Sequence, residues 1–177
     1  MSVHRALIVI DVQNDYFPGG AYPLWNTQET LTRIEEAIAL ARARNAAVIL
    51  VQHLAKPNPG SAPFFTTGTP GAEIHPRIRS AAPEAAVVIK GHADSFVDTT
   101  LEETLKRLGV HELLICGMMT QNCVTHTAIS KFAEKYKVTV LPDCCTTVDG
   151  MIHKFALNAL ALRVQLLPAA AAFGDAS

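Results

Sequence analysis

Three side chains that could cooperate in nucleophilic catalysis each stand near the end of an apolar segment. Asp11 closes the run RALIVID, Lys90 ends the run AVVIK, and Cys123 lies in the segment that follows the run ELLIC. A thiol is a nucleophile, a carboxylate can take and return its proton, and an ammonium stabilises the charged forms. Alone, each is more often a turn, solvated or packing residue. Their coincidence at three segment ends indicates a catalytic site.

The segments that must position these residues alternate between strand-like and helical patterns. Short runs of β-branched and other apolar residues indicate buried strands. Apolar residues spaced three and four apart indicate helices, and Asn26 with Glu29 forms a capping box before the first of them. The expected strands are residues 5–11, 46–53, 86–90, 112–116, 137–141 and 164–167, and the expected helices are residues 27–44, 99–108, 121–136 and 151–162.

This alternation predicts an α/β fold with three layers, α/β/α, around a six-stranded parallel sheet with Rossmann-like architecture. We expect a single domain over residues 1–177. Ligands of such sheets bind beyond the carboxyl ends of the strands, so the three candidate residues should share one rim. The long loop after the second strand is expected to cover the site or to form one wall, and the Ala-rich tail from Pro168 is expected to be loosely held. Four prolines mark that loop: Pro57, Pro59, Pro63 and Pro70.

The surroundings of Cys123 are expected to activate its thiol. The first turn of a helix offers free backbone N–H groups and the positive end of the helix dipole, and both favour a thiolate. Lys90 nearby would lower the pKa of the thiol further. Asp11 would take the thiol proton and later return it to a leaving group. The N–H groups of residues 117–123 would hold the oxyanion of a tetrahedral intermediate.

Composition and charge exclude several other classes of protein. The chain has 177 residues, is 49% hydrophobic, and carries 15 Lys+Arg against 16 Asp+Glu, so it is a folded globular chain with no basic excess for nucleic acid. Its apolar stretches are far shorter than the ~20 residues of a membrane helix, and we expect no signal peptide, because the first apolar run is short and ends at Asp11. We therefore expect a small-molecule substrate, no nucleic-acid or membrane partner, and a cytoplasmic location.

Four cysteines are expected to be reduced thiols, because a chain of this length needs no disulfides for stability. The adjacent pair Cys144 and Cys145 could bridge only through a strained ring. Both are expected to be small apolar fillers near the end of a strand.

Three longer motifs carry the candidate residues in the order ALIVIDVQNDYF, VVIKGHADSF and ICGMMTQNCVTHTA. Together they resemble those of the isochorismatase-like cysteine hydrolases, a family that includes nicotinamidases and N-carbamoylsarcosine amidases. The resemblance covers nearly the whole chain and implies an isochorismatase-type hydrolase fold. It also implies a homo-oligomer, either a dimer or a tetramer.

The resemblance also assigns roles to residues. It implies a triad in which Cys123 is the nucleophile, Asp11 the acid and base, and Lys90 the group that stabilises the charged forms. It implies a cis peptide bond between Met118 and Met119, and an oxyanion hole formed by the backbone N–H groups of Met119 and Cys123.

One departure from the family concerns a metal site. Nicotinamidases carry an Asp-x-His pair after the second strand and a further histidine in the following loop, whereas this chain reads Val51, Gln52 and His53 there. No histidine follows until His75. The pattern resembles the metal-free branch of the family, so we expect neither a metal nor another cofactor.

The expected pocket residues are Phe17, Trp25, His53, His92 and Phe96, which lie in or beside predicted loops. Aromatic residues there can form pocket walls, but core packing is an equal alternative for each of the three. His53 could contact substrate or form a local hydrogen bond, and His92 could line the pocket or lie in a solvated turn.

Three further features have competing interpretations. His126 could form a Cys-His dyad with Cys123, although an Asp/Lys pair already supplies that chemistry. Phe64 and Phe65 could cover the site or reach into a neighbouring subunit. Gly19 and Gly20 form a turn rather than a phosphate loop, since the Walker lysine and the GxGxxG spacing are missing.

The leading hypothesis is a metal-independent hydrolase that cleaves an amide, urea-like or imide C–N bond through a thioester on Cys123. A second enzymatic hypothesis is hydrolysis of a vinyl ether, in which Asp11 acts as an acid and the thiol is not a nucleophile. A third is a binding or redox-sensing protein that kept the fold and a reactive thiol.

Overall fold

The computed structural model describes residues 5–56 and 63–174 of the chain. Strands and helices alternate along these residues, as the sequence predicts. The strands are β1 (Arg5–Ile10), β2 (Ala47–His53), β3 (Ala86–Lys90), β4 (Glu112–Met118), β5 (Lys137–Thr146) and β6 (Gln165–Leu166). The helices are α1 (Thr27–Ala43), α2 (Pro76–Ala81), α3 (Leu101–Arg107), α4 (Thr125–Ala128), α5 (Gly150–Leu160) and α6 (Ala169–Phe173).

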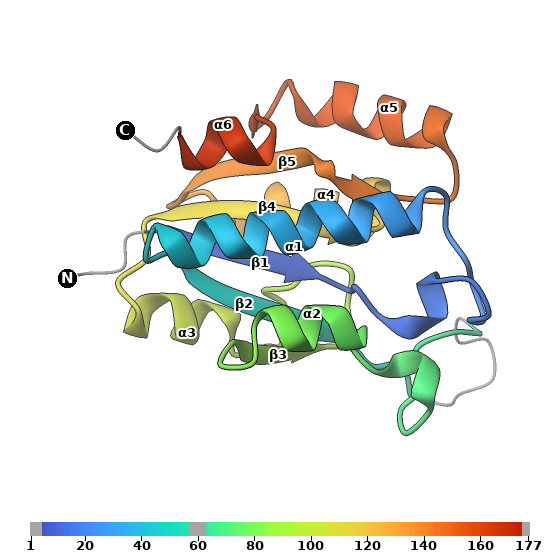
Figure 1. Cartoon of the computed structure of the whole chain (residues 1–177). Helices are drawn as coiled ribbons and strands as arrows, with labels where there is room; N and C mark the ends of the chain where they lie inside the picture. Colours follow the sequence, from blue (N-terminus) through green and yellow to red (C-terminus); the bar gives the residue numbers. More distant parts are fainter. Residues whose placement is uncertain (1–4, 57–62, 175–177) are drawn as a thin grey trace.

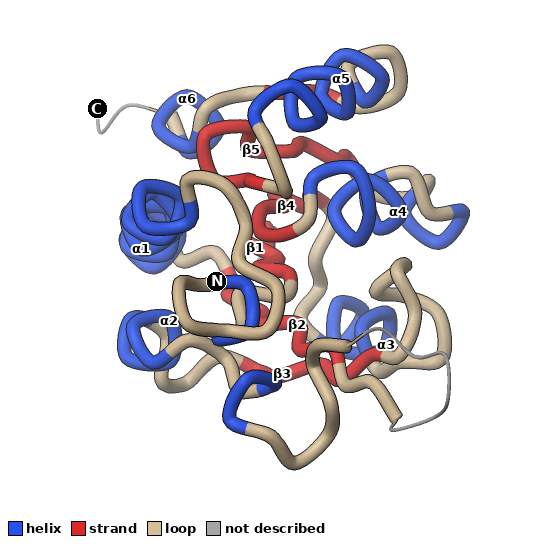
Figure 2. The backbone as a smooth tube through the Cα atoms, turned by 90° about the vertical axis from the view of Figure 1, so that its right-hand side faces the viewer, coloured by secondary structure: helices blue, strands red, loops and turns tan. Residues whose placement is uncertain are grey.

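The six strands form one parallel sheet in the order β3-β2-β1-β4-β5-β6. Helices α1, α2 and α6 cover one face of this sheet, and α3, α4 and α5 cover the other (Figures 1 and 2). This confirms the predicted three-layer α/β/α fold. The strand order reverses between β1 and β4, which is where parallel sheets of this kind place their ligands.

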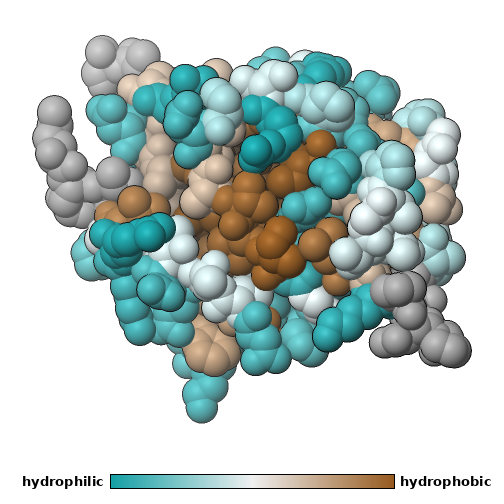
Figure 3. Space-filling view, turned by 90° about the horizontal axis from the view of Figure 1, so that it is seen from below, coloured by the Kyte–Doolittle hydropathy of each residue, from teal (hydrophilic) through white to brown (hydrophobic). Residues whose placement is uncertain are grey.

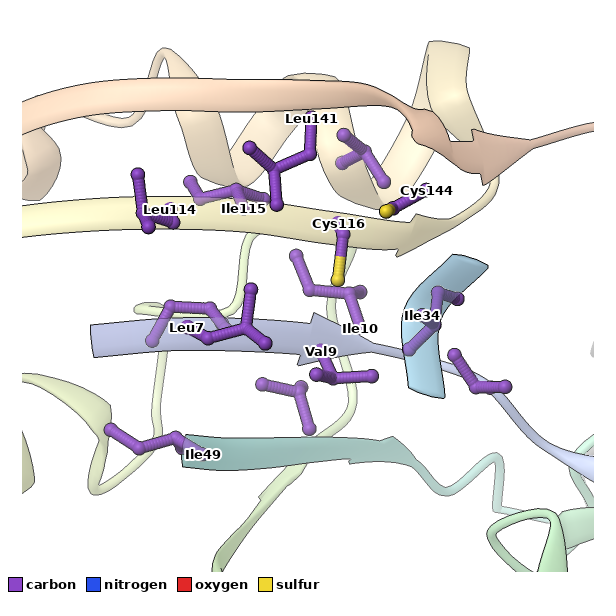
Figure 4. Packing of buried hydrophobic residues seen from close by; sticks show 14 of the residues in the cluster. Leu7, Val9, Ile10, Ile34, Ile49, Leu114, Ile115, Cys116, Leu141 and Cys144 are labelled. Carbon is purple, nitrogen blue, oxygen red and sulfur yellow. The ribbon is translucent and has the colours of Figure 1, made fainter. Parts of the chain in front are cut away.

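The hydrophobic core fills the space between the central strands and the covering helices. Leu7, Ile8 and Ile10 of β1 are fully buried, as are the apolar residues of β4 and the inner face of α1. Cys116 of β4 and Cys144 of β5 lie in this packing among branched aliphatic side chains (Figure 4). All four cysteines are free and buried, so Cys144 and Cys145 are packing residues within a strand.

Two element boundaries after β4 differ from the sequence prediction. The expected helix 121–136 is broken: a π-helical turn (Thr120–Val124) leads into α4, which ends at Ala128. Ser130 then accepts a hydrogen bond from the N–H of Phe132 and starts a separate 3-10 turn. Strand β5 is longer than the expected strand 137–141, because it continues through Pro142 to Thr146. A shift in its pairing register with β4 accommodates the proline.

Three smaller expectations also need correction. The described part of the tail, residues 169–174, is not loose, because it forms α6, whose Phe173 is buried. The predicted loop contains a short 3-10 turn (Pro70–Ala72), and α2, which Pro76 begins, follows the loop. The capping box of α1 does not form, since Asn26 adopts a left-handed conformation and its side chain bonds Glu29 instead of the backbone. Pro57 and Pro59 lie outside the described residues.

Gly117 is required where β4 passes β1. Its φ is +122°, and a Cβ atom there would overlap the carbonyl oxygen of Ile10. We expect Gly117→Ala to lower the free energy of unfolding by about 3 kcal/mol, because strain and overpacking add. Gly68→Ala is the matched control: its φ is +84° but its Cβ would meet no atom, so a loss of only about 1–2 kcal/mol is expected. Urea denaturation of both variants measures the difference, and equal losses would contradict the clash.

No helix within residues 5–56 and 63–174 is long and apolar enough to cross a membrane.

Candidate active site

The fold brings Asp11, Lys90 and Cys123 together at the carboxyl ends of the strands. Asp11 follows β1, Lys90 ends β3, and Cys123 lies in the π-helical turn after β4. The Nζ atom of Lys90 is 2.8 Å from Oδ2 of Asp11 and 3.2 Å from Sγ of Cys123. The Asp11 and Lys90 side chains are fully buried, and Cys123 is 3% exposed. Three segments far apart in sequence therefore form one desolvated cluster.

Lys90 has more neighbours than the triad alone provides. Its Nζ atom also lies 2.9 Å from Nδ1 of His53 and 3.0 Å from the carbonyl oxygen of His92. An ammonium has three N–H donors. His53, the His92 carbonyl and the Cys123 sulfur are aligned to accept them, whereas Asp11 is paired with Lys90 by charge at close range. The ammonium is thus fully surrounded by partners.

Sheet register explains why His53 reaches Lys90. The two residues are direct neighbours in the pairing of β2 with β3. Gln13, a buried side chain just after β1, holds the His53 backbone from the other side: its Nε2 donates to the His53 carbonyl oxygen at 2.8 Å, and its Oε1 accepts from the His53 N–H at 2.8 Å. Sequence reasoning did not single out Gln13, although a polar residue two positions after Asp11 is a usable signal.

Asp11 occupies a sharp turn of the chain. Its φ is +53°, a left-handed conformation that aspartate tolerates better than most residues. Its N–H still donates to the carbonyl oxygen of Val51 at 3.0 Å, so β1 and β2 stay paired up to this point. Within the described part of the chain, Oδ1 of Asp11 is buried without a hydrogen-bond partner. A buried carboxylate oxygen with no partner is free to exchange a proton with a reacting group.

Cys123 follows a peptide bond between Met118 and Met119 that is cis. Burial and the carboxylate of Asp11 raise the pKa of its thiol, and Lys90 opposes this only in part. The expected low pKa is therefore wrong, because the desolvation of the thiol and the neighbouring carboxylate together outweigh the effect of the one ammonium. Cys123 therefore keeps its proton until the reaction needs it.

A raised thiol pKa predicts slow alkylation of Cys123 in the free protein. At neutral pH, iodoacetamide should label Cys123 more slowly than an ordinary thiol with a pKa of about 8.5, because the thiolate is the reactive form. Lys90→Ala should slow labelling further, since Lys90 lowers the pKa of this thiol. Peptide mapping across pH measures the rate at each cysteine. Fast labelling of Cys123 well below pH 8.5 would contradict the assignment of a resting thiol.

Among the predicted pocket residues, the two histidines contact Lys90, whereas Phe17 and Trp25 have other neighbours. His53 contacts Lys90 directly, and His92 supplies its carbonyl oxygen while its ring lies at the surface, 3.4 Å from Oδ2 of Asp98. Phe17 is buried against the ring of His75, with centroids 4.4 Å apart. Trp25 is 45% exposed and lines a cavity of about 410 Å³ beside α5 with Asp143, Cys145 and His153.

Phe96 and His126 do not take the roles considered for them. Phe96 is buried and stacks near Phe132 and Tyr136, which makes it a packing residue. The Nδ1 atom of His126 lies 2.8 Å from the carbonyl oxygen of Asn122, one turn back in the chain. That bond ties the ring to the backbone, so the Cys-His dyad does not form.

A cluster of aromatic side chains lies beside the triad and includes one residue that sequence reasoning missed. Tyr16 is buried, and its ring centroid is 4.5 Å from that of Phe65 and 5.5 Å from that of Phe64. Burial, and then the nearby carboxyl group of Asp11, raise the pKa of its hydroxyl. Tyr16 therefore stands on the triad side of the cluster. Its position in the motif NDYF was the available signal.

Asp15 holds this aromatic cluster in place through hydrogen bonds to the backbone. Its Oδ2 accepts from the N–H of Phe65 at 2.7 Å, and its Oδ1 accepts from the N–H of Ala21 at 3.1 Å. A Cβ atom on Gly71 would overlap the same carboxylate. One buried side chain thus joins three loop segments beside the site.

Asp11, His53 and Cys123 are three residue types that can ligate a metal, and one ligand atom of each lies within 4.8 Å of the others. Nζ of Lys90, however, is within 3.2 Å of an atom of all three residues. Burial alone would lower the pKa of Lys90, but Asp11 and Cys123 together raise it, so the ammonium stays charged. A divalent cation among these atoms would be repelled at close range, so this set of residues does not fit a metal.

Comparison with known proteins places these features in a family. Residues 5–171 match the family model described as Isochorismatase domain. The uncharacterized isochorismatase family protein YddQ of Bacillus subtilis is 38% identical over 148 residues, which cover 84% of this chain and 81% of YddQ. A streptothricin hydrolase of Streptomyces noursei is 31% identical over 182 residues, which cover 95% of this chain and 69% of that protein.

Solved structures agree with this placement. An isochorismatase family protein from Desulfovibrio vulgaris has a TM-score of 0.84 and 28% identity, with 96% of this chain and 95% of that chain covered. The pyrazinamidase of Pyrococcus horikoshii in complex with zinc has a TM-score of 0.82 over 93% of this chain and 99% of that chain, but at 24% identity it shows only a shared fold. Because a protein with this fold binds zinc, membership of a metal-free branch is not established.

Proposed function

We propose, since this chain belongs to the isochorismatase family, that it is a metal-independent cysteine hydrolase acting on a C–N bond of a small molecule. The observation that carries the proposal is the buried ammonium of Lys90 in simultaneous contact with Asp11 and Cys123. A nucleophile and a proton acceptor each lie within 3.2 Å of the same fixed positive charge, and all three groups are buried away from water. That arrangement suits acyl transfer to sulfur.

The first half-reaction forms a thioester and releases an amine. Sγ of Cys123 attacks the carbonyl carbon of an amide, urea-like or imide group, and its proton passes to Asp11. The C–O π electrons move to oxygen, which gives a tetrahedral intermediate. As the C–N bond breaks, Asp11 returns the proton to the nitrogen, and the neutral amine leaves. Lys90 donates to sulfur throughout and offsets the negative charge that moves between Cys123 and Asp11.

The second half-reaction restores the enzyme. Asp11 takes a proton from water, whose oxygen attacks the thioester carbon. The C–S bond then breaks, the sulfur recovers the proton from Asp11, and the acid product leaves. In both steps we assign the oxyanion to the backbone N–H groups of Met119 and Cys123, which belong to the turn that presents the nucleophile. Donors fixed in this way need no reorganisation during the reaction.

The test is a screen of small amides, imides and ureas in buffer that contains EDTA. Turnover should be accompanied by a mass increase on Cys123 equal to the acyl group when the reaction is quenched early. The similarity of this chain to the streptothricin hydrolase of Streptomyces noursei supports hydrolysis as the reaction class. Activity that appears only with added zinc would overturn the metal independence, and turnover without any adduct would overturn the thioester.

A second candidate reaction is acid-catalysed cleavage of a vinyl ether, in which Asp11 protonates the substrate. Its support is the same buried carboxylate with its unpartnered Oδ1. A vinyl ether would then be consumed by a protein whose Cys123 never becomes acylated. The third alternative, a binding or redox-sensing protein, would show neither turnover nor an adduct, although Cys123 would react reversibly with peroxide.

We also propose that the protein is a homo-oligomer. Val87 and Ile89 of β3 are 36% and 46% exposed on the edge strand of the sheet. The face on which β3 lies shows a patch of apolar side chains (Figure 3). Light scattering should give the mass of a dimer or tetramer, and Val87→Lys should shift it to that of the monomer because a buried charge in an interface is costly. A wild-type monomer would contradict the proposal.

Four free thiols support a cytoplasmic location for this assembly.

A further inference from the structure

The contact between His53 and Lys90 defines the state of the histidine ring. Nδ1 of His53 lies 2.9 Å from Nζ of Lys90. An ammonium can donate hydrogen bonds but cannot accept them. Nδ1 must therefore be the acceptor, so it carries no proton. His53 is then a neutral imidazole whose single proton lies on Nε2.

Two independent features hold the ring in this position. His53 and Lys90 are register neighbours on β2 and β3, so their side chains start side by side. The buried amide of Gln13 bonds both the N–H and the carbonyl oxygen of His53, which fixes the backbone from which the ring projects. Gln13 is itself anchored, since its Nε2 also donates to the carbonyl oxygen of Ala72 at 2.7 Å.

We propose that His53 is a positioning residue that orients the ammonium of Lys90 between Asp11 and Cys123. Two of the three N–H groups of Lys90 go to acceptors outside the triad, namely His53 Nδ1 and the His92 carbonyl oxygen. These two bonds fix the rotation of the ammonium, so the remaining N–H points to the Cys123 sulfur. This inference rests on the proposed cysteine hydrolase function for its effect on turnover, but its structural part does not.

Protonation of His53 would break this arrangement. An imidazolium has no free Nδ1 lone pair and would place a second positive charge against Lys90. The charged and titratable groups that face His53 are Lys90, Asp11 and His92, with Cys123 across the ammonium. Burial and then Lys90 lower the pKa of His53, while Asp11 opposes them in part. The neutral, positioning form is therefore present at neutral pH and is lost as pH falls through the lowered value.

A substrate-free measurement tests the structural part. In protein labelled with nitrogen-15 on histidine, His53 should show an unprotonated Nδ1 and a protonated Nε2, with a titration midpoint below 6.5. His126 is an internal control with the opposite tautomer, because its Nδ1 faces a carbonyl oxygen and must donate. Lys90→Met should raise the His53 midpoint, since it removes a neighbouring positive charge. A protonated Nδ1 on His53, or a midpoint unaffected by Lys90→Met, would overturn the inference.

A pair of variants tests the effect on turnover. His53→Asn places an oxygen acceptor near the position of Nδ1 and cannot titrate, whereas His53→Leu removes the acceptor. We expect kcat of the Leu variant to fall about tenfold below that of the Asn variant, with KM nearly equal, because misorientation affects the transition state most. The wild-type profile should lose activity at acid pH with the midpoint seen by magnetic resonance. The Asn variant should lack that limb.

These readouts separate failure of the inference from failure of the proposed function. If no substrate is turned over but His53 has the expected tautomer and coupling to Lys90, the structural assignment stands and the hydrolase proposal fails. If turnover is found but the Asn variant keeps the acid limb, His53 is not the titrating positioning residue. Circular dichroism and thermal unfolding of both variants ensure that the comparison is made on folded protein.

Discussion

Replacing the thiol of Cys123 by hydrogen, in Cys123→Ala, should reduce C–N bond hydrolysis by about 10⁴-fold or more. Cys123 supplies the only thiol among the described residues that contact Lys90, so the thioester route is lost altogether. The fold should survive, because Cys123 is a small side chain and the substitution removes one atom. Steady-state assays on the substrate found in the screen, with the quenched-mass experiment in parallel, measure both turnover and the missing adduct.

Cys116→Ala is the matched control for this substitution. Cys116 is fully buried in β4 and lies in the core away from Lys90, so the same change of atoms removes packing without removing the nucleophile. A loss of stability of about 1 kcal/mol with retained turnover is expected for the control. Turnover by Cys123→Ala at more than a hundredth of the wild-type rate would exclude the thioester and leave the vinyl-ether reaction as the better explanation.

Asp11→Asn should also abolish turnover, by about 10²–10⁴-fold, but with the opposite effect on the thiol. The amide cannot take the proton of Cys123 or return it to a leaving group. At the same time, the negative charge that raises the pKa of Cys123 disappears while Lys90 remains. The pKa of Cys123 should then fall, and iodoacetamide at neutral pH should label this thiol faster than in the wild type.

This pairing of lost turnover with faster alkylation distinguishes a catalytic effect from unfolding. A merely unfolded protein would expose Cys116, Cys144 and Cys145 as well, so all four thiols would label together. Faster labelling confined to Cys123 is the expected result. Slower labelling, or turnover close to that of the wild type, would show that Asp11 is not the group that exchanges a proton with the thiol. Because both amide and vinyl-ether hydrolysis need Asp11, this variant tests the carboxylate independently of the bond cleaved.

The sequence predicted the sheet and the three central side chains well because their signals are local. Buried parallel strands appear as uninterrupted apolar runs, and the residue at the end of each run lies on the rim for any sheet of this topology. Asp11 and Lys90 could therefore be placed together before their distance was known. The break in the helix after Cys123 was harder to predict. The hydrogen bond to Ser130 that starts a separate turn differs little in free energy from continuation of the helix.

The charge state of the site could not be predicted because it depends on burial that only the folded chain creates. The sequence indicates a cation near a thiol and hence a low thiol pKa, but the structure adds desolvation and a carboxylate within reach. The contact between His53 and Lys90 was hidden for a similar reason, because it requires the pairing register of β2 with β3. Asp15 and Gln13 act through backbone groups of distant loops, which leave no spacing pattern in the sequence.

The position of Lys90 on β3 has a consequence for how the site is lost under stress. β3 is one of the two edge strands of the sheet and, within one protomer, pairs only with β2, whereas the strands that lead to Asp11 and Cys123 lie in the middle. Edge elements open more readily than central ones, because fewer bonds must break. Detachment of β3 would remove the ammonium of Lys90 and leave Asp11 and Cys123 without a positive partner, while the rest of the sheet stayed folded. The catalytic site is therefore expected to be lost under milder stress than the stress that unfolds the sheet.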